Sequence, residues 1–101
     1  MVRRKEVSIH RRVIEHISAI ASFIKNQGLA QTALKFINDI FDLFSGLSEK
    51  RVTHRLCSFP NWRQKNYRCA TFRKKYSVAY LDLLHEIIVS DFAVTKYLVS
   101  K

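Results

Sequence analysis

The chain has 101 residues, which is enough for one domain with one hydrophobic core, so we treat residues 1–101 as a single domain. Its 48% hydrophobic content is too high for a disordered chain, and two Gly with one Pro supply few of the breakers that a many-turned β protein needs. The formal net charge of +10 favours a partner of opposite charge.

Processing and membrane signals are weak. No apolar run approaches the roughly 18 residues that a membrane span requires. The basic start, residues 1–7, is not followed by an apolar stretch as in a signal peptide, and we expect it to be a flexible arm. The two cysteines are too few for a disulfide framework and are expected to be buried thiols. These features predict an intracellular protein of the cytoplasm or of the nucleoid or nucleus.

The first half of the chain predicts a helical hairpin. Apolar residues recur at helical spacing over residues 8–25, with Ser8 as the expected N-cap and Gly28 supplying a left-handed end. A second apolar pattern covers residues 29–45 and stops at Gly46. The short break between the two patterns predicts that the helices are antiparallel neighbours.

The second half also predicts helices. Ser48 can cap a short helix to Leu56, and Pro60 ends it. No Gly or Pro follows Asn61, and the apolar run over residues 78–88 indicates a long, central, buried C-terminal helix. The expected fold is therefore all-α, a small bundle of four to five helices.

Basic residues gather in two parts of the chain and predict a phosphate-binding surface. No acidic residue occurs from position 50 to position 75, and Lys and Arg neutralise nucleic-acid phosphates with release of counterions. The candidate nucleic-acid-binding residues are Arg3, Arg4, Arg11, Arg12, Lys50, Arg51, His54, Arg55, Arg63, Lys65, Arg68, Arg73, Lys74 and Lys75. The main hypothesis is thus a small basic protein that binds DNA or RNA.

A short segment indicates how DNA could be read. Residues 46–56 resemble the second half of a helix-turn-helix, with a turn Gly, the Ser48 cap, and Val52 and Leu56 facing inward. The resemblance implies a recognition helix with five residues facing the major groove: Glu49, Lys50, Arg51, Thr53 and His54. The preceding residues differ from the family, because bulky Phe side chains occupy the place where small residues usually let the two helices cross.

The alternative hypothesis is a protein-interaction module, such as an adaptor or an inhibitor of a larger nucleic-acid machine. Phe36, Phe41 and Phe44, together with Ile37 and Leu43, spread over more than half of the circumference of the second predicted helix. The three Phe could form a partner-binding face. A homodimer would bury the same excess of aromatic surface. Attachment of the first helix to an anionic membrane surface is a third option, through Arg11 and Arg12.

Catalytic and metal-binding patterns are not found. The chain has no Gly-rich phosphate loop and no nucleophile elbow, and its adjacent His–Glu pairs point apart on a helix. His54, Cys57 and Cys69 would give zinc only three ligands, and zinc needs a fourth. We therefore expect a binding protein without cofactor or metal, and not an enzyme.

Overall fold

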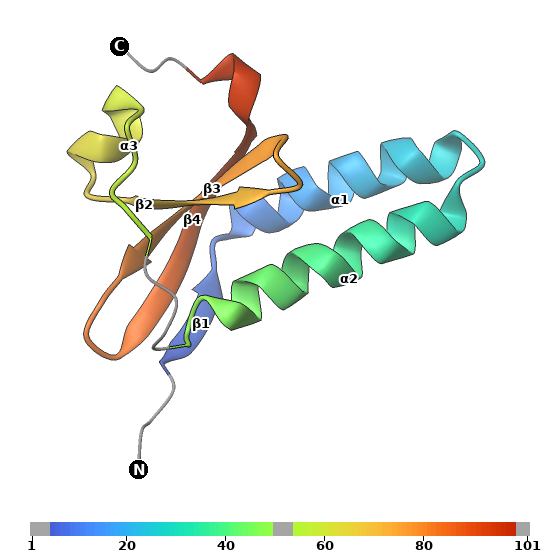
Figure 1. The fold of residues 1–101 in the computed structure, drawn as a ribbon. Helices are drawn as coiled ribbons and strands as arrows, with labels where there is room; N and C mark the ends of the chain where they lie inside the picture. The colour runs from blue at the N-terminus through green and yellow to red at the C-terminus, as the bar shows by residue number, and fades with distance from the viewer. Residues whose placement is uncertain (1–4, 50–53, 99–101) are drawn as a thin grey trace.

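The computed structural model describes residues 5–49 and 54–98 and combines helices with a four-stranded sheet (Figure 1). The elements in chain order are β1 (Glu6–Ile9), α1 (Arg11–Asn26), α2 (Ala30–Gly46), α3 (Pro60–Gln64), β2 (Arg68–Phe72), β3 (Tyr76–Asp82), β4 (Glu86–Val94) and the 3₁₀ turn η1 (Thr95–Tyr97). The strand order is β1-β4-β3-β2, with β1 parallel to β4 and the other pairs antiparallel. The all-α prediction is therefore wrong.

The long C-terminal helix is the specific error. Residues 76–94 instead form the two central strands of the sheet, and both faces of β3 are covered. Tyr76, Val78 and Tyr80 pack on the side of the helices, while Ala79 and Leu81 pack on the opposite side. A strand buried on both faces has apolar residues at nearly every position, so its period of two is hidden.

Both helices of the predicted N-terminal hairpin are present, and they lie side by side on one face of the sheet (Figure 1). Every third or fourth residue of each helix is buried, including Val13 and Ile17 of α1 and Phe36 and Ile40 of α2. Gly28 has a φ of +82°, a left-handed conformation that costs glycine little, and it separates the two helices as expected.

The start of α1 differs from the prediction. Ser8 belongs to β1, where its hydroxyl donates to the Glu86 carboxylate at 2.6 Å. His10 caps the helix instead, because its Nδ1 accepts a hydrogen bond from the backbone N–H of Arg12 at 3.1 Å. Of the expected flexible arm, Glu6 and Val7 are residues of β1, and residues 1–4 lie outside the described residues.

The opposite face of the sheet carries a second, smaller core. Cys57, Trp62 and Tyr67 are buried there against Ala79 of β3. Cys57 and Cys69 form a disulfide with a Cα–Cα distance of 4.9 Å, so the expectation of two buried free thiols is wrong. The bond could not be predicted because the spacing of two cysteines does not reveal which backbone segments become neighbours.

The short helix expected at residues 48–56 is not present in its described part. Leu56 forms an isolated antiparallel bridge with Arg68, and His54 is in neither a helix nor a strand. Lys50, Arg51 and the rest of residues 50–53 lie outside the described residues. Without a helix at His54 and Leu56, the described residues give the helix-turn-helix resemblance no support.

Candidate interaction surfaces

An apolar groove lies between α1 and α2. Small side chains from both helices, such as Ala21 and Ala33, leave a hollow of about 430 Å³ between the helix axes. Its lining residues are Ser18, Ala21, Ser22, Lys25, Ala30, Ala33, Leu34 and Ile37. Lys25 is the one charged member of this set.

Exposed apolar side chains lie on the same helical hairpin as the groove. Phe23 is 66% exposed, Leu34 is 54% exposed and Leu29 is 50% exposed. Single exposed apolar residues are ordinary on protein surfaces, but these three on one hairpin, of which Leu34 also lines the apolar hollow, are typical of an interaction site. We call these three residues with the lining of the hollow the hairpin surface.

The Phe-rich face of α2 is not part of the hairpin surface. Phe36 and Phe44 are 2% and 1% exposed and belong to the main core, and Phe41 is half-buried beside them. The hypothesis that these rings form a partner-binding face therefore needs correction. The main core between α2 and the sheet buries the aromatic side chains that the sequence analysis interpreted as a contact surface.

The predicted basic residues do not form one patch. Arg11 and Arg12 begin α1, and Arg12 is engaged internally because its Nε donates to the backbone oxygen of Ser90 at 2.9 Å. Arg55, Arg63 and Lys65 are exposed on the chain before β2, and Arg68 lies half-buried in β2. Arg73, Lys74 and Lys75 come together at the turn between β2 and β3. Arg3, Arg4, Lys50 and Arg51 are outside the described residues.

The β2–β3 turn consists of three consecutive bases in an uncommon conformation. Arg73 and Lys74 have φ values of +54° and +58°, where Gly or Asn is usual and other residues are strained by about 1 kcal/mol or more each. Arg73 is held by a hydrogen bond to the Asp39 carboxylate at 2.7 Å and lies over the rings of Phe36 and Phe72. That bond keeps the pKa of Asp39 below its ordinary value of 3.8.

The turn lies next to a second group of exposed side chains. The backbone N–H of Thr95 donates to the oxygen of Lys75 at 2.9 Å, which places η1 beside the turn. Lys96 of η1 has its ammonium 5.1 Å from the centre of the Tyr97 ring, and Tyr97 is 74% exposed. Tyr97 also lines a hollow of about 320 Å³, whose other lining residues are Phe59, Pro60, Asn61, Trp62 and Leu98.

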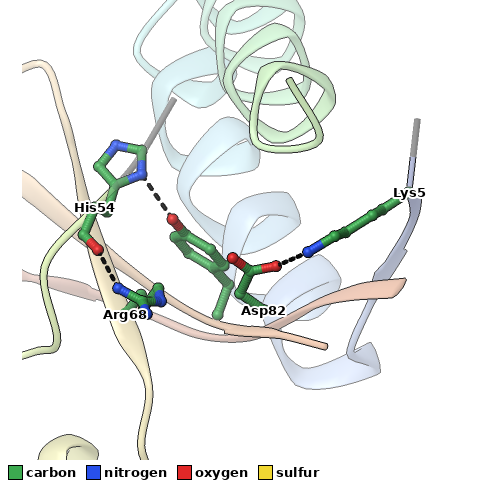
Figure 2. A network of polar contacts seen from close by, with 5 residues as sticks. Lys5, His54, Arg68 and Asp82 are labelled. Atoms are coloured by element: carbon green, nitrogen blue, oxygen red, sulfur yellow. Dashed lines mark hydrogen bonds and ion pairs between the residues drawn. The ribbon is translucent and has the colours of Figure 1, made fainter. Parts of the chain in front are cut away.

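A polar network occupies the opposite end of β2 and β3 (Figure 2). His54 Nδ1 lies 2.7 Å from the Tyr80 hydroxyl, and Arg68 donates to the backbone oxygen of His54 at 2.6 Å. Lys5 pairs with Asp82 in the same region. The pKa of His54 is lowered from 6.5 by burial and by the Arg68 charge, so its ring is neutral at pH 7. Burial, helped by the Asp82 charge, raises the pKa of Tyr80 to about 12.

Metal binding has no geometric support among the described residues. Within ranges 5–49 and 54–98, no three His, Cys, Asp or Glu side chains gather closely enough to hold an ion. The three ligands considered for zinc are also separated chemically, because Cys57 and Cys69 are bonded to each other and His54 contacts Tyr80. Across the same ranges, every helix falls short of the length and apolarity that crossing a bilayer demands.

Comparison with known proteins informs the fold. No protein-family model matches the chain, and no curated protein matches it. One solved structure superposes with a TM-score of 0.72 and covers 90% of this chain and 96% of its own. It is described as the chromosomal ParDE TA system from P. aeruginosa. The fold is therefore shared with a toxin–antitoxin protein. At 17% identity the likeness shows the fold and nothing finer.

Sequence reasoning missed several of these features. The groove requires two helices to be paired with small residues facing each other, and Ala21, Ala33 and Ser18 carry no distinctive pattern in the sequence. Lys96 and Tyr97 were not candidates because only tertiary structure places them beside the β2–β3 turn. The exposure of Phe23 was open to detection, since it lies off the apolar stripe of residues 13, 17, 20, 21 and 24.

Proposed function

We propose that this protein acts by binding another protein, as one member of a toxin–antitoxin pair, and that the hairpin surface receives its partner. The observation that carries the proposal is the open apolar groove with Phe23, Leu29 and Leu34 exposed on the same hairpin. The shared fold with a chain of a ParDE system supports it. This is the protein-interaction alternative of the sequence analysis, moved from the Phe-rich core to a different surface.

The chemistry of the partner segment follows from the surface. An amphipathic helix could lay apolar side chains along the groove, where Ala21 and Ala33 allow close approach. Acidic residues on its flanks would complement Lys25 and the net charge of +10. We therefore expect an acidic, amphipathic helical segment, and we retain the prediction that the chain is a binding protein and not an enzyme.

The test is co-expression with the product of the reading frame adjacent to the gene of this protein, followed by titration calorimetry. Leu34→Glu places a charge in the groove and should weaken binding by at least about tenfold, since burying an unpaired charge costs more than 1.4 kcal/mol. Leu84→Glu is the matched control, because Leu84 is 81% exposed in the β3–β4 turn and does not line the groove. Equal affinity of the two variants, or no complex with the wild type, would contradict the proposal.

A second candidate function is the predicted nucleic-acid binding, restricted to a smaller site at the β2–β3 turn and η1. Lys74, Lys75 and Lys96 form no ion pair within the described residues, and Tyr97 offers an open aromatic face beside them. Ammonium groups beside an exposed ring suit a single strand, whose phosphates and unpaired bases would use both. Homodimer formation stays a prediction.

Fluorescence anisotropy with a labelled single strand and its duplex, at two salt concentrations, tests this second candidate. Lys74→Ala with Lys96→Ala should flatten the salt dependence, and Tyr97→Ala should weaken binding about tenfold. Arg11→Ala with Lys25→Ala removes the same charge from the helical hairpin and serves as the control. If both double variants lose affinity equally, the attraction is diffuse and the narrowed site is rejected.

A further inference from the structure

The Cys57–Cys69 disulfide closes a loop that contains the whole of α3. Cys57 precedes α3 and Cys69 is in β2, at a sequence separation of 12 residues. The bond therefore ties the chain segment that contains α3 to β2, the edge strand of the sheet. We call residues 54–67 the α3 cover.

The α3 cover shields the sheet on the face opposite the helical hairpin. Cys57, Trp62 and Tyr67 are buried there, and Phe59 packs against the same cluster. The strand residues beneath it include Ala79, which is fully buried. None of the cover residues belongs to the main core between the hairpin and the sheet. The two cores are thus distinct, and His54 is the cover residue that contacts the main core, through the hydroxyl of Tyr80.

Beside the apolar packing of the second core, polar contacts join the cover to the sheet at its start and over α3. At the start of the cover, the Arg55 oxygen accepts from the N–H of Cys69 at 3.1 Å, and the His54 oxygen accepts from the Arg68 guanidinium. Over α3, the Trp62 indole donates to the Asp91 carboxylate at 3.2 Å. The His54 ring contacts the Tyr80 hydroxyl. The chain itself joins the cover to β2 between Tyr67 and Arg68, and the disulfide adds a covalent cross-link between Cys57, on the other side of α3, and Cys69 of β2.

We propose that Cys57–Cys69 is a redox latch, which holds the α3 cover closed in the disulfide form and lets it open in the dithiol form. A thiolate of a cellular thiol reductant attacks one sulfur, forms a mixed disulfide and expels the other as a thiolate. A second thiol of the reductant then attacks the mixed disulfide. Two electrons and two protons pass to the protein, which gains two thiols, and the reductant becomes a disulfide.

The burial of the two cysteines sets the direction of this exchange. Cys57 is 1% exposed, whereas Cys69 is half-buried. An incoming thiolate can approach Cys69 more easily, so the mixed disulfide forms there and Cys57 leaves. Cys57 is also the cysteine of the mobile side of the latch, because its segment is outside the four-stranded ladder.

Opening would uncover two surfaces at once. The edge of β2 would lose its partner at Leu56, and the backbone N–H of Cys69 would become free to bond another chain. The apolar sheet face around Ala79 and Leu81 would lose its cover. Reduction would thus create an interaction surface remote from the groove between α1 and α2, so the latch does not depend on the proposed partner binding there.

Hydrogen exchange measured by mass spectrometry, with and without a small dithiol reductant, tests the latch on the full chain. We expect amides of residues 54–69 to exchange at least about tenfold faster in the dithiol form, because the loop-closure constraint is removed. Amides of α1 and α2 should be unchanged. Trp62 is the one tryptophan of the chain and lies in the cover, so its emission should shift to the red.

Cys57→Ser with Cys69→Ser provides the matched variant. It should show the fast exchange of residues 54–69 in the absence of reductant and should not respond further to it. Equal exchange of the oxidised and reduced wild type would overturn the proposal. A uniform acceleration that includes α1 and α2 would overturn it too, because the bond would then stabilise the whole fold and would not control the cover.

Discussion

His54 illustrates at the residue scale how burial changes the chemistry of a side chain. In the sequence it was a candidate for contact with DNA, yet its ring contacts the Tyr80 hydroxyl, and its backbone oxygen accepts a hydrogen bond from the Arg68 guanidinium. Both burial and that positive charge disfavour its protonated form. A neutral imidazole attracts phosphate less than an imidazolium does, so His54 is better understood as part of the contact between the α3 cover and β3.

The lowered pKa of His54 predicts a pH dependence of stability. The unfolded state binds a proton near the ordinary value of 6.5 and the folded state only at lower pH, so stability is lost as pH falls from 6.5 toward the folded-state pKa. His54→Gln should remove this part of the loss. Urea unfolding of both proteins at a pH above 6.5 and at one below it measures the difference, and an identical loss in both would contradict the assignment.

At the scale of single elements, the sequence predicted the position of α2 correctly but the role of its Phe side chains wrongly. Its predicted bounds, residues 29–45, differ by one residue at each end from Ala30–Gly46. Its aromatic residues were interpreted as an excess over what a core could bury. The sheet accommodates them, because Phe36 makes edge contacts with both Phe72 and Tyr76.

This role of α2 can be tested with two Phe variants of the helical hairpin. Phe44→Ala should cost about 3–5 kcal/mol of unfolding free energy, since a large ring that is 1% exposed leaves a cavity. Phe23→Ala should cost little stability, because Phe23 is 66% exposed, and should weaken partner binding instead. Chemical denaturation measures the first effect and calorimetry with the partner the second. The reverse pattern would restore α2 as the contact face.

The strands were the elements that sequence reasoning missed. The alternation of β4 between the two faces changes phase after Val89, because a register shift opposite Ala79 and Tyr80 leaves Ser90 as an extra residue. Beyond that point the side chain of Arg12 donates a hydrogen bond to the backbone oxygen of Ser90, and Nδ1 of His16 lies 2.8 Å from the backbone oxygen of Phe92. The backbone of β1 thus pairs with the first part of β4, and side chains of α1 bond the backbone oxygens of the part that follows. No local sequence pattern encodes this change from backbone to side-chain partners.

At the scale of the whole molecule, most of the basic residues lie outside the apolar groove between α1 and α2. Among the 18 bases behind the net charge of +10, groups lie at the start of α1, in the chain before β2 and at the β2–β3 turn. The groove between α1 and α2 has Lys25 as its charged member. A partner that binds through apolar contacts in the groove would therefore still be attracted over a distance by the basic surface around it.

The sequence by itself determined the helical hairpin, its Gly28 turn and the excess of positive charge, because helical periodicity, capping and charge are local or additive properties. Tertiary structure alone decided that residues 68–94 are strands, that Cys57 meets Cys69, and that a groove opens between α1 and α2. Each of these depends on contacts between distant segments. An apolar run reads alike as a buried helix or as a strand covered on both faces until the partners that cover it are known.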